Sequence, residues 1–131
     1  MGPEPNVRGG FLGLFSTLFE ASRQHRYEYQ LFHYTTLKRI SEIKTQGLIK
    51  AKYGKTYVTD RPLSPADAER NLFFNAPNKK GHGDYVVIMD APETFVNQLT
   101  EDPSTPLGYI YPGSIRHGRH VDFMYLGPNP Y

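Results

Sequence analysis

LFHYTT (residues 31–36) and GKTYVTD (residues 54–60) bound the stretch of sequence that decides the fold of this chain. His33 ends an apolar run in the first segment, and Tyr57 and Asp60 follow a glycine-bearing turn in the second. Side chains with useful chemistry are often held where strands end, because a rigid scaffold fixes the backbone from which they project. The sequence therefore predicts that the functional site lies between these two segments.

A strand, a helix and a second strand are predicted across this stretch. Alternate residues of 27–34 share one face of an extended chain, which predicts the first strand. Thr35 or Thr36 is the N-cap of the following helix, whose apolar positions at helical spacing are Leu37, Ile40 and Ile43. Gly47 is its stop signal, since glycine adopts the left-handed conformation after a last helical turn. Short extended segments are predicted after it, at residues 48–49 and 57–58.

The second half of the chain predicts more strands than helices. Ser64-Pro65-Ala66-Asp67 has the features of a helix start, and this helix is expected to run to about Phe73. Residues 84–90 are apolar on both faces and predict a central strand. A short helix over residues 92–100 and two more strands are expected, over residues 107–111 and 121–125, with Leu126-Gly127-Pro128 ending the last one. The predicted fold class is α+β, with several short strands and a few helices.

Length and composition indicate the number of domains and exclude some kinds of chemistry. The chain has 131 residues, no cysteine, and 15 Lys plus Arg against 13 Asp plus Glu. One domain is expected, over residues 27–131, without disulfides or thiolate chemistry. Residues 1–26 are predicted to form an N-terminal tail or linker with a helix over residues 11–19, which is too short to span a bilayer. No secretory signal and no membrane anchor are predicted.

The histidines and glycines do not match the common metal and phosphate motifs. His117 and His120 flank a Gly-Arg turn without acids at ligand spacing, so no metal site is predicted. A metal-free ribonuclease that uses His33 with one of these two histidines remains an alternative. Gly54-Lys55-Thr56 resembles the end of a phosphate-binding loop, but Ile49 occupies the position where that motif requires glycine. The segment is therefore predicted to be a turn.

Several short motifs nevertheless occur in one order: His-Tyr-Thr, a helix ending in glycine, a Gly-Lys-x-Tyr turn, Tyr-x-Thr-Asp and a capped helix. This pattern resembles the ADP-ribosyltransferase toxin domains with a His-Tyr-Asp signature, which occur at the C-termini of bacterial polymorphic toxins, including Rhs-type toxins. The resemblance covers residues 31–90, with a weaker match over residues 109–115. It implies a compact split β-sheet with a few short helices that binds NAD as a substrate and needs no metal.

The resemblance also implies roles for individual residues. His33 would bind the nicotinamide ribose, the backbone around Tyr34 would hold the carboxamide, and Tyr57 would stack on the nicotinamide ring. Thr35 and Thr59 would supply further hydroxyl groups. The catalytic residues implied are His33, Tyr57 and Asp60.

The sequence departs from many ADP-ribosyltransferases at the catalytic acid. Many ADP-ribosyltransferases have a catalytic glutamate at the start of a late strand, and residues 106–109 contain no acid. Asp60 is the acid of the signature, and Glu101, Asp102 and Asp122 are the late alternatives. The chemistry is consistent with the implied set, because cleavage of the nicotinamide–ribose bond needs a fixed ribose, a held leaving ring and a negative charge near the developing cation.

The function expected from this resemblance is mono-ADP-ribosylation by an antibacterial toxin. The acceptor would be a macromolecule, either protein or RNA, including ribosomal RNA of the translation machinery. A secretion system would deliver the toxin into the cytoplasm of a target cell, and a cognate immunity protein would protect the producer. An NAD glycohydrolase and a non-catalytic binding module are further alternatives. A phosphate-facing rim is one interpretation of eight basic residues, namely Lys44, Lys50, Lys52, Lys55, Lys79, Lys80, Arg116 and Arg119.

Overall fold

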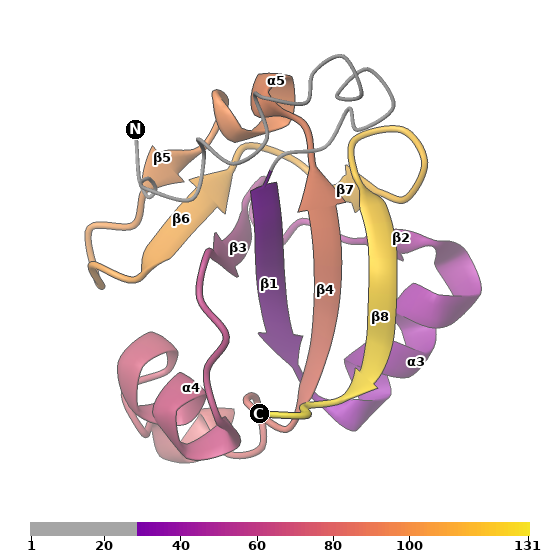
Figure 1. Ribbon diagram of the computed structural model, residues 1–131. Helices are drawn as coiled ribbons and strands as arrows, with labels where there is room; N and C mark the ends of the chain where they lie inside the picture. Colours follow the sequence, from indigo (N-terminus) through magenta and orange to yellow (C-terminus); the bar gives the residue numbers. More distant parts are fainter. Residues whose placement is uncertain (1–28) are drawn as a thin grey trace.

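β1 (Tyr29–Thr35) lies in the interior of a six-stranded antiparallel sheet in the computed structural model, which describes residues 29–131 (Figure 1). The strand order is β5-β6-β3-β1-β4-β8. The other strands of this sheet are β3 (Thr56–Thr59), β4 (Tyr85–Ala91), β5 (Thr100–Glu101), β6 (Gly108–Tyr111) and β8 (Asp122–Pro128). A second, two-stranded sheet pairs β2 (Leu48–Ile49) with β7 (Ile115–Arg116). The predicted α+β class is confirmed.

Three α-helices and one 3-10 turn complete the described part of the chain. They are α3 (Leu37–Gln46), α4 (Pro65–Leu72), the 3-10 turn η1 (Pro77–Lys79) and α5 (Glu93–Val96). The predicted caps of the first two are confirmed: Thr36 Oγ1 accepts from the Arg39 amide at 3.3 Å, and Ser64 Oγ accepts from the Asp67 amide at 3.1 Å. Gly47 ends α3 with φ of 65°, a conformation that glycine adopts without steric cost.

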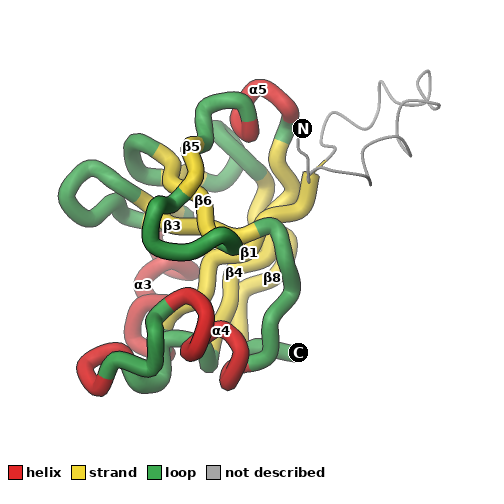
Figure 2. Tube along the Cα trace, turned by 90° about the vertical axis from the view of Figure 1, so that its left-hand side faces the viewer, coloured by secondary structure: helices red, strands yellow, loops and turns green. Residues whose placement is uncertain are grey.

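The two faces of the sheet are covered by different helices. α3 packs on one face, where Ile40 and Ile43 join a cluster with Leu31, Val87 and Met89. α4 lies toward the other face, where the core consists of Phe32, Tyr34, Ala68, Val86 and Ile88. Figure 2 shows α3 on one side of the strands and the C-terminal residues on the opposite side. β4 is buried on both faces, as its uninterrupted apolar sequence predicts.

The end of the chain and the short elements differ from expectation. β8 does not stop before Leu126-Gly127-Pro128 but continues through them, with Pro128 opposite Tyr85. β8 is an edge strand, where a proline that cannot donate to the ladder is tolerated. The expected helix over residues 92–100 is reduced to α5, and the two-residue strands β5 and β7 were not predicted. The predicted helix over residues 11–19 lies outside the described residues.

The junction between β1 and β3 is the weakest in the large sheet. β1 pairs with β4 over seven residues, whereas β1 pairs with β3 only through Phe32 and Thr59. β3 then pairs with β6 over four residues. The strands β5, β6 and β3 therefore form one part of the sheet and β1, β4 and β8 another, joined by a single residue pair. Among residues 29–131, no helix has the length and apolar character needed to cross a membrane.

Candidate functional site

A cleft of about 900 Å³ is lined by residues from β1 and β3 and by residues near their single pair. α3, β2 with the residues that follow it, and the residues that follow α4 also line the cleft, together with part of the loop between β5 and β6. Of the residues predicted to bind NAD, four line this cleft: His33, Tyr34, Thr35 and Tyr57. Residues of both sequence motifs, 31–36 and 54–60, thus line one cavity.

His33 connects the two strands where the ladder between them stops. Its Nδ1 lies 2.7 Å from the carbonyl oxygen of Tyr57. A carbonyl can only accept, so Nδ1 donates and Nε2 is left as an acceptor in the neutral ring. Burial lowers the pKa of His33 from its ordinary value of 6.5, the Tyr57 carbonyl opposes this shift, and the charge of Arg39 adds to it. Burial thus favours the neutral form of the imidazole, in which Nε2 is an acceptor nitrogen at the cleft.

Tyr34 also links β1 to the segment that follows β3, through its hydroxyl group. Its hydroxyl accepts from the Leu63 amide at 2.6 Å and donates to the Arg61 carbonyl at 3.3 Å. Burial raises the pKa of this hydroxyl to about 12. The ring is almost fully buried beside Phe32, so the side chain of Tyr34 holds the turn after β3 in place. The predicted role of the backbone around Tyr34, binding of the carboxamide, stays a prediction.

Tyr57 is an exposed aromatic residue. Its side chain is 48% exposed although it lies within a strand of the sheet, and it lines the cleft. Thr35, at the end of β1, also lines the cleft but is buried. Thr59 does not line the cleft; it is fully buried, and its hydroxyl accepts from the Arg61 amide at 3.4 Å. The structure therefore brings Tyr57 and Thr35 to the site and leaves Thr59 outside it.

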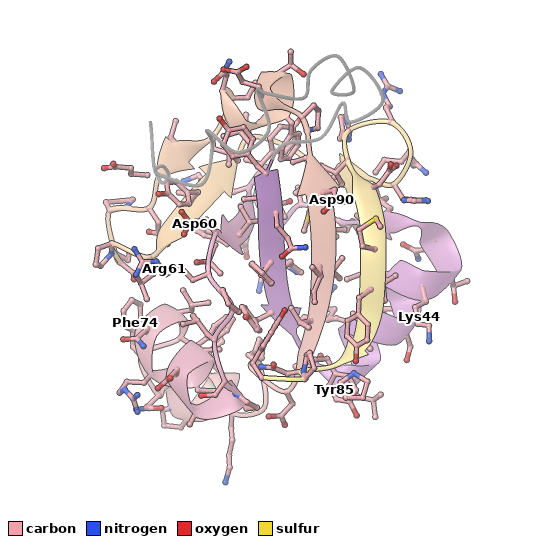
Figure 3. All side chains as sticks on the ribbon, viewed as in Figure 1. Lys44, Asp60, Arg61, Phe74, Tyr85 and Asp90 are labelled. Carbon is pink, nitrogen blue, oxygen red and sulfur yellow. The ribbon has the colours of Figure 1, made fainter. Side chains whose placement is uncertain are left out.

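Asp60 is not among the residues that line the cleft. It follows β3 with a side chain that is 15% exposed, and its carboxylate lies 3.6 Å from the Arg61 guanidinium (Figure 3). The late alternatives Glu101 and Asp122 do not line the cleft either. Asp122 lies opposite Asp90 in the β4–β8 ladder, away from the cleft. The two carboxylates that do line it are Glu42 and Asp102.

Glu42 and Asp102 differ in their surroundings. Glu42 lies on α3 and is paired with Arg39 at 3.7 Å, which is one helical turn away. Asp102 lies in the loop between β5 and β6, where its Oδ1 accepts from the Ser104 amide at 2.8 Å. Asp102 had been considered among the late acids, whereas no sequence signal pointed to Glu42. Glu42 could be assigned to the cleft only once the packing of α3 against the sheet was known.

The cleft carries an excess of positive charge. Six basic side chains and two carboxylates line it. Four of the basic residues belong to the predicted rim, and α3 supplies two that were not predicted: Lys50, Lys52, Lys55, Lys79, Lys38 and Arg39. The other four residues of the predicted rim do not line the cleft, namely Lys44, Lys80, Arg116 and Arg119. Such a lining attracts phosphate groups.

The histidines proposed for a ribonuclease are not brought together with His33. His117 and His120 lie in the segment between β7 and β8, and neither lines the cleft. Both rings accept from backbone amides at 2.9 Å, His117 from Phe123 and His120 from Arg116, so both stabilise this segment. His82 does line the cleft, but its ring packs on Phe73 and its Nδ1 bonds to the Lys79 carbonyl. Within residues 29–131 no group of three His, Asp or Glu side chains is arranged to hold a metal ion.

One further residue of the cleft had no sequence signal. Phe74 lines the cavity and is 57% exposed, in a left-handed backbone conformation with φ of 56°. Neither the conformation nor the exposure could be inferred from its position beside Phe73.

Comparison with known proteins identifies no relative: no protein family, no curated protein and no solved structure matches the chain.

Proposed function

We propose that this chain is an NAD-dependent mono-ADP-ribosyltransferase that acts as an antibacterial toxin on a macromolecular target. The observation that carries the proposal is the meeting of His33 and Tyr57 at one cleft, through the 2.7 Å bond from His33 Nδ1 to the Tyr57 carbonyl. Two residues 24 positions apart thus contribute a hydrogen-bond acceptor and an exposed aromatic ring to the same cavity. The sheet junction with a single pair beside this cavity fits a split β-sheet with the substrate between its two parts.

The neutral state of His33 supports its proposed role toward the ribose. Nε2 accepts a hydrogen bond from a ribose hydroxyl, while Nδ1 keeps the ring oriented through the Tyr57 carbonyl. Tyr57 provides an aromatic platform for the nicotinamide ring, which contributes about 0.5–1.5 kcal/mol beyond area burial. The basic lining complements the two phosphates of NAD. Each group thus meets a part of the substrate with matching chemistry.

The reaction transfers ADP-ribose from nicotinamide to the acceptor. The bond between the ribose anomeric carbon and the nicotinamide nitrogen breaks, and its electron pair neutralises the pyridinium ring. A nucleophile of the acceptor forms the new bond to the anomeric carbon and loses its proton. The transition state resembles an oxocarbenium ion, so a nearby carboxylate stabilises it. Asp60 is the acid of the signature and Asp102 is a carboxylate of the cleft lining, which makes these two the residues to compare.

The test is incubation of the purified chain with adenylate-labelled NAD and a bacterial lysate, followed by separation of protein and RNA. Wild type is expected to label one fraction. Tyr57→Ala is expected to lose most of this label, whereas Tyr57→Phe retains it because stacking does not need the hydroxyl. Asp60→Asn and Asp102→Asn, assayed together, identify the carboxylate by which variant loses label while keeping its thermal stability.

Other outcomes separate the alternatives. Consumption of NAD without any label in macromolecules would identify an NAD glycohydrolase with the same donor site. RNA fragments formed without NAD would identify a ribonuclease, although His117 and His120 lie off the cleft. NAD left intact by wild type would refute the proposal. Delivery into a target cell and a cognate immunity protein belong to the same proposal, and co-expression with genes adjacent to the toxin gene tests for protection.

A further inference from the structure

We propose that Phe74 is a second aromatic platform of the cleft and stacks on the adenine ring of the donor dinucleotide. The inference rests on the proposed function, because it assigns a residue to the other end of the same substrate. It goes beyond the His-Tyr-Asp signature, in which this position has no part.

The backbone at Phe74 directs its side chain away from the core. Phe74 and Asn75 both have positive φ, of 56° and 53°. This reversal after α4 is fixed by hydrogen bonds from the Asn75 amide to the Glu69 carbonyl at 2.9 Å and from the Ala76 amide to the Phe73 carbonyl at 3.0 Å. A bulky residue is disfavoured in the left-handed region, where glycine or asparagine fits better. Strain of this kind, in an exposed residue, is typical of functional sites.

Adjacent phenylalanines have opposite environments at this turn. Phe73 packs against the core cluster around Phe32, and its ring centroid lies 5.2 Å from that of His82. Phe74 is 57% exposed and lines the cleft instead. Hydrophobic burial therefore explains the presence of Phe73 but not that of Phe74. A large apolar side chain at a cavity wall is available to a ligand.

The composition of the cleft matches a dinucleotide with two flat rings and a charged centre. Tyr57 and Phe74 are exposed aromatic residues of one cavity, on different segments of the chain. Basic side chains of the same lining, such as Lys55 and Lys79, complement the pyrophosphate between the rings. Since Tyr57 is assigned to the nicotinamide, Phe74 is the platform that remains for the adenine.

The chain contains a matched control for this assignment. Tyr53 is also an aromatic residue with positive φ, of 53°, and it is 91% exposed. It occupies a tight turn in which the Lys52 and Lys55 backbones exchange hydrogen bonds at 2.9 and 3.1 Å, and it does not line the cleft. Tyr53→Ala and Phe74→Ala therefore remove an exposed ring from the same backbone conformation, one outside the cavity and one inside it.

The experiment measures dissociation constants of three ligands by calorimetry: NAD, adenosine monophosphate and nicotinamide mononucleotide. Phe74→Ala is expected to weaken binding of NAD and adenosine monophosphate by about 10-fold or more, the range for loss of one base–aromatic stack. Binding of nicotinamide mononucleotide is expected to stay unchanged. Tyr53→Ala is expected to bind all three ligands like wild type, and Phe74→Trp to restore NAD binding.

Two results would overturn the assignment. One is unchanged NAD affinity in Phe74→Ala; the other is an equal loss for both mononucleotides, which would indicate a general distortion of the cleft. Phe74→Asn guards against misfolding, because asparagine suits the left-handed backbone and removes only the ring. It is expected to lose adenine binding at undiminished melting temperature. Failure of wild type to bind NAD at all would refute the proposed function itself, which distinguishes the two failures.

Discussion

The neutral, hydrogen-bonded state of His33 makes the stability of the fold depend on pH in a way that one substitution should remove. His33→Phe keeps a ring of similar size and deletes the donor to the Tyr57 carbonyl. At pH 7.5 the variant is expected to be less stable by about 1 kcal/mol, the typical net value of one intramolecular hydrogen bond. The hydrogen bond is exposed to solvent, which keeps this cost near the lower end of the range for a carbonyl that loses its partner.

Acid should reduce this difference. The pKa of His33 in the folded protein is lowered from 6.5 because burial disfavours the imidazolium. Below pH 6.5 the unfolded chain therefore binds a proton that the folded protein does not, and the free energy of unfolding falls. At pH 5.5 this linkage removes at most about 1.4 kcal/mol from wild type, one pH unit below the unfolded value, and nothing from His33→Phe. The stability difference between the two proteins should then be smaller than it is at pH 7.5.

The assay is urea denaturation of both proteins at pH 7.5, 6.5 and 5.5, followed by circular dichroism. Burial also lowers the pKa of His120 and raises that of Asp90, but both groups are present in each protein, so their effects cancel in the difference. A stability difference that stays constant from pH 7.5 to 5.5 would refute the reasoning. It would show that His33 has the same proton affinity in the folded and unfolded states.

Three further substitutions test a partly buried hydrogen bond, a close backbone contact and a left-handed glycine. Tyr34→Phe removes the hydroxyl that bonds to Leu63 and Arg61. Because the Leu63 amide loses its acceptor, the free energy of unfolding, measured by urea denaturation, is expected to fall by about 1–3 kcal/mol. An unchanged denaturation midpoint would contradict this. Gly83→Ala would place a Cβ 2.6 Å from the Pro65 carbonyl oxygen, so about 1–3 kcal/mol of overpacking should lower the melting temperature. Gly47→Ala meets no atom within 4 Å but has φ of +65°, so its loss, measured in the same way, should be only about 1 kcal/mol.

Local signals in the sequence predicted the elements whose ends are marked by their own residues. Thr36 and Gly47 delimit α3, and Ser64 starts α4, because caps act within a few residues of the helix they bound. β5 and β7 were missed because each is only two residues long and is defined by its partner strand. The end of β8 was misplaced because Pro128 stops an interior strand but not an edge strand.

The candidate site also contains some residues that the sequence indicated and others that only the packing of the elements revealed. The sequence predicted a site between the motifs that contain His33 and Tyr57, and both residues line one cavity. The contribution of Arg39 and Glu42 required knowledge of how α3 packs against the sheet, and the exposure of Phe74 required the reversal after α4. The roles of His33, Tyr57 and Asp60 in catalysis remain predictions, with Asp60 placed outside the lining of the cleft.

The single residue pair between β1 and β3 has a consequence for amide hydrogen exchange. β1, β4 and β8 are joined by long ladders, so the amides that are hydrogen-bonded within these ladders should exchange only through global unfolding. β3, β6 and β5 are held to them by Phe32 and Thr59 and by the His33 and Tyr34 side chains, which favours a smaller opening that frees this group alone. Because Tyr57 belongs to the more weakly protected group, a ligand that bridges the cleft should slow exchange in β3 and β6, and exchange in β4 should slow as well because the unfolded chain does not bind the ligand.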